Sequence, residues 1–311
     1  MDVEALGTFL TVRRAGGFSA AAHRLGRTQP AISHRIRLLE EELGVPLFER
    51  TAAGVVLTQA GGVLEPYAER VLAAVADAKA AVLSLVNEAS GPVSLAIVGT
   101  LASAPLSTAL RRFAQTHPGV DLRLCTARSA EISEMVRRGD VVLGLRYEHD
   151  RSPDLSCETL AVDPLVVVCA LDHPLAGHTL VDLKLLAGER WVAFPEIPGQ
   201  REIAAAHVFG LFASKGLGEV DWTAVDSLTA QKHLVEAGFG LAIMPSRNVS
   251  EELGDGTIAR IQVRDLDAAM SIVAVVRKGG FLSLAADQLL ALLREGLALP
   301  ARGRHRARRH K

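Results

Sequence analysis

Residues 18–40 read FSAAAHRLGRTQPAISHRIRLLE, and this stretch predicts two short helices with a tight joint between them. The joint is Gly26-Arg27, where glycine can take a backbone angle that other residues avoid. Thr28 follows as a candidate N-cap, whose hydroxyl can accept a hydrogen bond from the next turn. Pro30 falls in the first helical turn, where its missing N–H is of little consequence.

The second of these helices has one apolar and one polar face. After a first helix, expected over residues 3–15, these two helices are expected over residues 19–25 and 28–43. In the second, the apolar positions recur at intervals of four, three and four, so they share one face: Ile32, Ile36, Leu39 and Leu43. The polar face opposite or beside them holds Gln29, Pro30, Ser33, His34 and Arg37. A helix-turn-helix places such a second helix in the DNA major groove.

Positive charge is concentrated in the same place. Residues 23–37 hold four arginines and two histidines and no acid, whereas residues 1–88 together carry 9 Lys+Arg and 10 Asp+Glu. The basic residues lie where the second helix would meet DNA phosphates. The alternative on these residues alone is an ordinary helical hairpin with a solvated basic face.

The order of residues resembles the LysR-type bacterial transcriptional regulators. The resemblance covers residues 1–61 and rests on Phe9, Val12, Ala15-Gly16-Gly17-Phe18-Ser19, Ala21-Ala22, Leu25, Thr28-Gln29-Pro30-Ala31-Ile32-Ser33, Leu39-Glu40, Leu43-Gly44, Leu47-Phe48, Arg50, Leu57-Thr58 and Ala60-Gly61. It implies a winged helix-turn-helix over residues 1–59 that binds double-stranded DNA at an interrupted palindromic operator. The expected DNA-binding residues are Ser19, Arg27, Thr28, Gln29, Pro30, Ser33, His34, Arg37 and Arg50.

A long helix is expected from Thr58 to about Asn87, with the linker proper over residues 60–88. Apolar residues follow a heptad stripe that suits packing along another helix: Leu64, Ala68, Val71, Val75, Ala78, Val82 and Leu85. Pro66 lies inside it and should bend it locally. In the resembled family this helix pairs with a second subunit, which implies a homodimer or tetramer. The alternative is that it packs against its own domain.

After a hinge at residues 88–92, short apolar runs alternate with helical stretches, which predicts an open parallel sheet. Strands are expected over residues 93–98, 121–125, 141–145, 165–170, 191–194 and 219–223, with a helix near 199–215. The resemblance implies a two-lobed α/β effector domain like a periplasmic solute-binding protein, over residues 89–300. One lobe would hold residues 92–162 and 266–300, and the other 163–265.

Polar side chains follow several of these strands. Because ligands of open α/β sheets bind beyond the carboxyl ends of strands, we expect the effector there. The expected effector-binding residues are Thr100, Ser103, Arg128, Ser129, Arg146, Phe194, Pro195, Val225 and Met244. Free N–H groups and hydroxyls suit a small polar or anionic molecule. Alternatively, Thr100 and Ser129 are only helix caps and Arg146 bridges the lobes.

Enzyme motifs are missing: there is no Gly-x-Ser-x-Gly, no His-Glu-x-x-His and no phosphate-binding loop ending in Lys-Ser/Thr. Asp172, His173 and Asp182 are read as turn and cap residues. The 3 cysteines are odd in number and widely spaced, which argues against a disulfide framework or zinc site. We therefore expect no catalytic residue, cofactor or metal. The competing class is a small-molecule binding protein or enzyme to which the helix-turn-helix is incidental.

No apolar run approaches the ~18 residues that span a membrane. The N-terminus lacks the features of a signal peptide, so a cytoplasmic protein without membrane contact is expected. Residues 301–311 hold five arginines and one lysine and no acid. Such a basic block is usually disordered, either as an arm on DNA or as a solvated tail.

Overall fold

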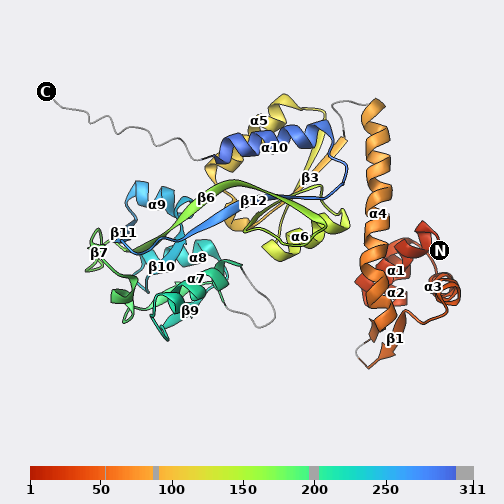
Figure 1. Ribbon diagram of the computed structural model, residues 1–311, viewed down its shortest axis with the longest axis horizontal. Coiled ribbons are helices and arrows are strands. Elements are labelled where there is room, and N and C mark those ends of the chain that lie inside the picture. The colour runs from red at the N-terminus through yellow and green to blue at the C-terminus, as the bar shows by residue number, and fades with distance from the viewer. Residues whose placement is uncertain (53, 87–90, 196–202, 299–311) are drawn as a thin grey trace. The chain divides into compact units, whose positions relative to one another are not determined.

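The computed structural model describes residues 1–52, 54–86, 91–195 and 203–298 (Figure 1). Its contacts divide the chain into two compact units, the first built mainly from Met1–Glu88 and the second mainly from the residues after it. The predicted basic tail at 301–311 lies outside the described residues. The predicted order of a winged helix-turn-helix, a long helix and a two-part α/β region is confirmed.

The first unit is three helices, a β-hairpin and a long helix. Each of the three helices ends on a glycine with positive φ: Gly16 at 70°, Gly26 at 60° and Gly44 at 73°. Only glycine takes this backbone angle without strain, so these residues fix where the helices stop. The elements are α1 (Val3–Ala15), α2 (Phe18–Leu25), α3 (Gln29–Leu43), β1 (Phe48–Thr51), β2 (Gly54–Leu57) and α4 (Gln59–Val86).

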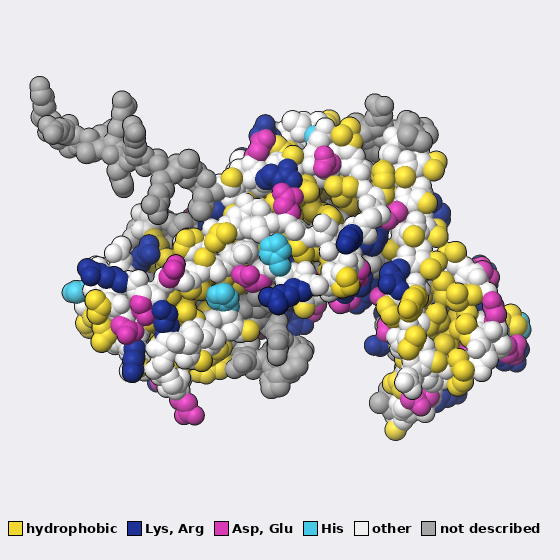
Figure 2. Space-filling model, viewed as in Figure 1, with side chains coloured by type: hydrophobic (Ala, Val, Ile, Leu, Met, Phe, Trp, Pro, Cys, Tyr) yellow, Lys and Arg dark blue, Asp and Glu magenta, His cyan; other side chains and the backbone are white. Residues whose placement is uncertain are grey.

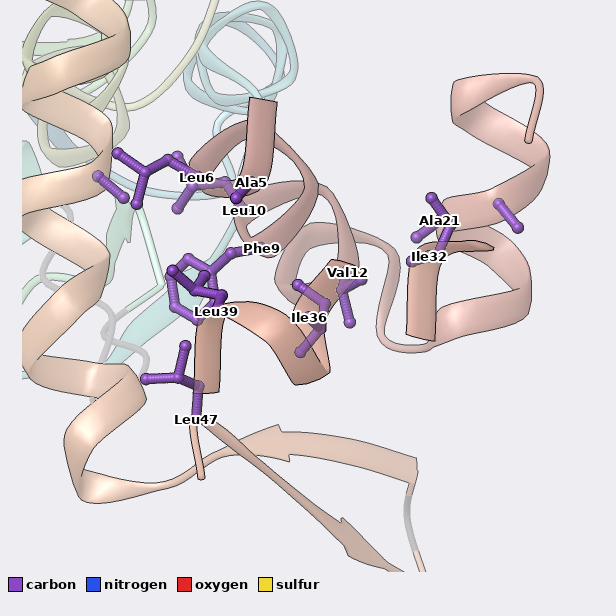
Figure 3. Close-up of a cluster of buried hydrophobic side chains, with 12 residues drawn as sticks. Ala5, Leu6, Phe9, Leu10, Val12, Ala21, Ile32, Ile36, Leu39 and Leu47 are labelled. Carbon is purple, nitrogen blue, oxygen red and sulfur yellow. The ribbon is translucent and has the colours of Figure 1, made fainter. Parts of the chain in front are cut away.

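One hydrophobic cluster holds this unit together (Figure 3). Phe9 of α1 is fully buried in it, and its ring packs at a tilt against that of Phe48, with 5.2 Å between the ring centroids. The other buried side chains come from the inward faces of the helices and from Leu47 in the loop after α3. They include Leu6, Leu10, Val12, Ala21, Ile32, Ile36, Leu39 and Ala68. Burial of α3 on one side leaves its polar side in solvent.

Two local predictions about α3 were wrong. Thr28 is the N-cap, but its side chain makes no capping bond. Its carbonyl instead accepts from the N–H groups of Ala31 and Ile32. Leu43 was expected in the core and is 39% exposed. Leu47, just past the turn at Gly44, occupies the core in its place.

The stripe on α4 changes its surroundings along the helix. Ala68 is buried in the hydrophobic cluster and Leu64 packs against that cluster, so this part of the stripe contacts the helix's own domain. Further along, Val71 is 39% and Val82 is 63% exposed. Hydrophobic side chains accordingly gather on the surface of α4 in Figure 2. Packing within the first unit therefore accounts for only the beginning of the stripe.

The second unit contains a mixed sheet of order β4-β3-β5-β12-β6-β11-β7, with β10 also paired to β6. β8 and β9 form a separate parallel pair. The strands are β3 (Gly91–Ile97), β4 (Val120–Thr126), β5 (Leu143–Tyr147), β6 (Leu155–Ala170), β7 (Thr179–Leu180), β8 (Trp191–Ala193), β9 (Trp222–Ala224), β10 (Ala242–Pro245), β11 (Ile258–Val263) and β12 (Ala269–Arg277).

The prediction of a parallel sheet holds only in part. β3 is parallel to β4 and β5, but β12 is antiparallel to β5 and β6. The reason is the 16-residue strand β6, of which only the end was expected. It pairs with β12 over Leu155–Pro164 and with β10 and β11 over Leu165–Ala170, so one strand serves both halves of the unit.

Helices cover both faces of the sheet. Figure 1 shows α5 and α10 together on one side of β3 and α6 on the other. The helices are α5 (Ala104–Thr116), α6 (Ser129–Arg138), α7 (Ile203–Ser214), α8 (Leu228–Glu236), α9 (Ser250–Asp255) and α10 (Leu284–Leu297), with 3-10 turns η1 (Gly99–Leu101), η2 (Leu183–Leu186) and η3 (Ser246–Val249). The strand expected at residues 219–223 begins only at Trp222, where it pairs with Trp191. A search of the described helices finds none with the length and hydropathy of a membrane span.

Candidate functional site

The solvent side of α3 presents the polar residues that the sequence singled out. Pro30, His34 and Arg37 are exposed, while Gln29 and Ser33 are half-buried. Gln29 Nε2 donates a hydrogen bond to Ser33 Oγ over 2.8 Å. This bond across one helical turn fixes both side chains, as a base-reading pair requires.

Arg37 is held by its own helix. Its Nη2 lies 2.8 Å from His34 Nδ1, and its Nε lies 3.5 Å from Glu41 Oε1. Both side chains of the ion pair are more than half exposed, so the pair is weak and an incoming phosphate can replace the carboxylate. The guanidinium is thus positioned and still available.

Glu4 of α1 contacts two other arginines of the basic stretch. Its Oε1 lies 3.9 Å from Arg27 Nη2 and forms an ion pair with Arg35 Nη1. A carboxylate here lowers the positive potential that would attract phosphate. No short sequence pattern indicates this contact, because Glu4 lies 23 positions before Arg27 in the chain.

The wing, which is the hairpin of β1 and β2, is attached to α3 by Glu40. Its Oε1 accepts hydrogen bonds from the backbone N–H of Leu47 over 2.7 Å and of Phe48 over 3.3 Å. Arg50 on β1 is exposed, as are Ser19 on α2 and Thr28. The predicted DNA-binding residues therefore lie on the solvent side of their elements.

The second unit contains two adjoining hollows, which we name the inner pocket and the outer cleft. The inner pocket is a cavity of ≈ 20 Å³ whose polar lining is Thr100, Tyr147, Gln231 and Asn248. The outer cleft measures ≈ 680 Å³ and is lined in part by Thr100, Arg128, Phe194, Pro195, Asp226 and Lys232. Thr100, Phe194 and Leu228 line both, so the two hollows share a wall.

Five of the nine predicted effector residues line these hollows: Thr100, Arg128, Phe194, Pro195 and Met244. The structure does not bring Ser103 or Val225 to either lining. Ser103 is the N-cap of α5, although its side chain makes no capping bond. The carbonyl of Val225 accepts a hydrogen bond from Gln231 Nε2 over 2.7 Å, which holds Gln231 at the pocket wall.

Ser129 and Arg146 are also placed elsewhere, within the packing around β5. Arg146 is 4% exposed and donates to the Tyr147 carbonyl over 3.2 Å and to Ser133 Oγ. It also donates to Asp150 Oδ2 over 2.8 Å. Ser129 is 1% exposed, and its hydroxyl accepts from the Tyr147 N–H over 3.4 Å.

Tyr147 takes the position that the sequence assigned to Arg146. Successive side chains of a strand point to opposite faces, so when Arg146 bonds Ser133 of α6, Tyr147 faces the other side. There it lines the inner pocket. Tyr147, Gln231 and Asn248 were missed because no turn signal or charge marks them.

Both cations of the outer cleft are paired with carboxylates. Arg128 Nη2 donates to Glu131 Oε1 over 2.6 Å, and the Arg128 backbone N–H donates to Glu131 Oε2 over 3.0 Å. These hydrogen bonds lower the pKa of Glu131 below its usual range. Lys232 forms an ion pair with Glu252. The outer cleft is therefore polar without a strong excess of positive charge.

The inner pocket holds hydroxyls in an apolar surrounding. Burial raises the pKa of Tyr147, and the neighbouring Thr100 and Asn248 offset part of that rise. Tyr147 thus stays a neutral phenol. Asp163 of β6 lies close enough to add to the rise, and burial raises the pKa of Asp163 itself.

Within the described residues no group of three or more His, Cys, Asp or Glu side chains is arranged to hold a metal ion. The arrangement offers a polar helix face in one unit and a ligand-sized hollow in the other. Neither place shows a nucleophile activated by a neighbouring base, which hydrolytic chemistry would need.

Comparison with known proteins gives two family matches. Residues 3–62 match a bacterial regulatory helix-turn-helix protein of the lysR family, and residues 87–298 match a LysR substrate binding domain. The chain is 31% identical over 290 residues to the HTH-type transcriptional regulator CbbR of Rhodospirillum rubrum, covering 92% of this chain and 93% of that one. It is 29% identical over 287 residues to the RuBisCO operon transcriptional regulator of Allochromatium vinosum, with coverages of 92% and 93%.

Solved structures of full-length regulators share the fold. A structure of full-length CbnR complexed with its target DNA has a TM-score of 0.62 and 25% identity, covering 95% of this chain and 100% of that one. Full-length BenM has a TM-score of 0.58 and 25% identity, with coverages of 95% and 96%.

Proposed function

Because this chain belongs to the LysR family of transcriptional regulators, we propose that α3 and the wing bind operator DNA and that a small molecule in the second unit modulates this binding. The chain is a regulator and not an enzyme. The observation that carries the proposal is the exposed polar face of α3, with its Gln29–Ser33 pair, in a chain whose second unit has a ligand-sized cleft.

On the DNA side, Gln29 and Ser33 read base edges in the major groove. Amide and hydroxyl groups in the first turns of a recognition helix have the reach for this. Phosphate contacts come from the exposed basic and hydroxyl side chains around them, which are Ser19, Arg27, Thr28, His34, Arg37 and Arg50. Pro30 fixes the start of α3, so that these side chains face one way.

The protein acts as a homodimer or tetramer on an interrupted palindrome. Support comes from α4, whose apolar stripe continues beyond the part that packs in its own domain. Two copies related by a two-fold axis would read two half-sites, about 34–36 Å or a multiple apart. We place the limits at 1–59 for the DNA-binding domain, 60–88 for the linker helix, 89–300 for the effector domain and 301–311 for the tail.

The effector occupies the outer cleft and inner pocket. A volume of ≈ 680 Å³ is in the range of pockets that bind small organic molecules. Such a ligand switches DNA binding only if it prefers one arrangement of the protein, typically by ~1–3 kcal/mol. Since genomic DNA is the partner, the protein works in the cytoplasm.

The test is DNA binding to the region upstream of the protein's own gene and its neighbours. Fluorescence anisotropy and footprinting of the full chain should show two protected half-sites, with affinity falling steeply as salt rises. Sequence-independent binding with no footprint would contradict the proposed function.

A further inference from the structure

The inner pocket contains two buried hydroxyls without hydrogen-bond partners. Tyr147 is 1% exposed, and its hydroxyl makes no hydrogen bond of good geometry among the residues that the structure describes, although Thr100 and Asn248 lie close enough to lower its pKa. The same holds for Thr100 Oγ1, which lines the same pocket. Folded proteins rarely leave such groups unpaired, because removal from water without a new hydrogen bond is unfavourable. Two of them in one cavity therefore point to a ligand atom between them.

The two volumes determine how much of a ligand each hollow can take. A cavity of ≈ 20 Å³ has room for about one water-sized group. The outer cleft, at ≈ 680 Å³, has room for a whole small molecule. Because Thr100 and Phe194 line both, one molecule can lie in the outer cleft and place a single substituent in the inner pocket.

The described lining of the inner pocket offers no cation to an anionic substituent. Among the described residues that line it, none is charged, and its apolar wall includes Leu165, Met244 and Met270. Of the charged groups nearby, Asp163 raises the pKa of Tyr147 and Arg247 lowers it, so their effects on an inserted group oppose each other. Arg247 lies beside Asp163, with its Nε 3.9 Å from Asp163 Oδ2, and its Nη2 donates to the Leu297 carbonyl over 2.8 Å.

The charges of the outer cleft do not favour a ligand whose main part is strongly anionic. Its cations, Arg128 and Lys232, each face a carboxylate, Glu131 and Glu252. Asp226 adds a further acid to the lining. An anion would have to displace these carboxylates, whereas an uncharged ligand leaves both ion pairs intact.

We propose that the effector is an uncharged organic molecule that inserts one hydroxyl or carbonyl group between Tyr147 and Thr100, with its body in the outer cleft. The inference rests on the proposed function and narrows its ligand from polar or anionic to polar and uncharged. Tyr147 donates to the inserted oxygen, and an inserted hydroxyl can donate to Thr100 Oγ1 in turn.

Methionine methyl groups provide a direct test on the full chain. The chain has 4 methionines, of which Met244 and Met270 line the inner pocket while Met1 and Met135 serve as internal references. Protein labelled with ¹³C at the methionine methyls would be titrated with benzyl alcohol against benzoate, and with cyclohexanone against cyclohexanecarboxylate, at equal millimolar concentrations. Met244→Leu and Met270→Leu assign the two signals.

The alcohol and the ketone should shift the Met244 and Met270 signals, and the carboxylates should not. Tyr147→Phe and Thr100→Val should each weaken this binding roughly five- to tenfold, as loss of one hydrogen bond predicts. Tyr67→Phe is the matched control, since Tyr67 is 58% exposed and the chain has 2 tyrosines. Without any probe, Tyr147→Phe should melt at the same temperature as the parent or higher, because it removes an unpaired buried hydroxyl.

Three results would overturn the inference. In the first, the carboxylates shift the two signals as strongly as the neutral probes do. In the second, neither neutral probe shifts them. In the third, Tyr147→Phe lowers the melting temperature by several degrees. The last result would show that the hydroxyl is bonded within the protein. Anisotropy with operator DNA, measured on the same samples, separates the two proposals: a chain that binds DNA but prefers carboxylates keeps the proposed function and loses only this ligand class.

Discussion

Arg146 and Asp150 form an ion pair inside the second unit, with Nη1 2.8 Å from Oδ2 and side-chain exposures of 5% and 18%. The pair uses the arginine for structure, because the same guanidinium also bonds Ser133 of α6 and the Tyr147 carbonyl. It therefore ties the carboxyl end of β5 to the helix beneath it. Tyr147, the next residue, is left to face the inner pocket.

This ion pair predicts a stability change in acid. Burial alone would raise the pKa of Asp150, but hydrogen bonds from Ser152 and Ser133 and the charge of Arg146 outweigh it and hold the pKa below its ordinary value. The unfolded chain then takes up the proton first, so the stabilisation is complete above about pH 4 and is lost as pH falls below that. In urea unfolding between neutral and acid pH, the unfolding free energy of Asp150→Asn should fall less steeply in acid than that of the parent. An equally steep fall in both proteins would mean that Asp150 does not cause the loss of stability in acid.

Removing Arg146 should lower the free energy of unfolding more than removing a surface charge does. Arg146→Met leaves the half-buried carboxylate of Asp150 without its cation, which should destabilise by up to about 3–5 kcal/mol, the loss typical of a fully buried pair. Arg112→Met, at an exposed pair with Glu295, is the comparison and should change the unfolding free energy by less than about 1 kcal/mol. Similar losses in both variants would contradict a special role for the buried pair.

The two kinds of contact on α3 should respond differently to mutation. Gln29→Ala is expected to relax sequence choice, by roughly 1–3 kcal/mol of discrimination at one base pair. Arg37→Ala is expected to lower the affinity for all DNA sequences alike and to reduce the salt dependence of binding by about one counterion. Anisotropy with operator and scrambled DNA at several salt concentrations measures both. Arg111→Ala, exposed in the second unit, is the control, and parental behaviour of both α3 variants would disprove the placement.

Glu4 should lower the affinity for DNA. Glu4→Gln removes a negative charge beside Arg27 and Arg35 and frees both for phosphate. The gain should be modest, up to about fivefold at low salt, and should fade as salt screens the charges. Asp121→Asn, which breaks an exposed pair with Arg123 in the second unit, should leave affinity unchanged. A loss of affinity in Glu4→Gln would show that the carboxylate positions the arginines instead.

The exposed part of the α4 stripe should be needed for assembly. Val82 is 63% exposed, so Val82→Asp should leave the fold intact. In a helix pair it would bury an unpaired charge, at a loss of several kcal/mol. Sedimentation should then show monomers where the parent is oligomeric. Leu185→Asp, at an equally exposed apolar site in η2, is the control, and a fully oligomeric Val82→Asp would exclude this seam.

Much of the first unit could be predicted because its signals are local. Helix α1 was expected over residues 3–15 and is Val3–Ala15, and the stops at Gly26 and Gly44 follow from glycine's access to positive φ. Apolar residues at helical spacing gave the buried face of α3 correctly for Ile32, Ile36 and Leu39. Local spacing also gave β3, β4, β5, β8 and α7 of the second unit.

Pairing between distant strands was outside the reach of the sequence. β6 continues through both halves of the second unit because β12, β10 and β11 pair with successive parts of it. Those partners lie about 70 to 120 positions further along the chain, so no short sequence pattern predicts the pairing. The antiparallel centre of the sheet was missed for this reason.

The choice between Arg146 and Tyr147 as the pocket residue was made by the tertiary structure alone. A strand with one wet face alternates polar and apolar residues, and that alternation reveals which side chains point inward. All five residues of β5 are buried, so its sequence Leu143-Gly144-Leu145-Arg146-Tyr147 carries no such alternation. The sequence indicated that a strand ends here, and the structure places a hollow beside that end. Packing of Arg146 against Ser133 and Asp150 decided which face it takes, and so placed the neutral hydroxyl of Tyr147, rather than a cation, in the inner pocket.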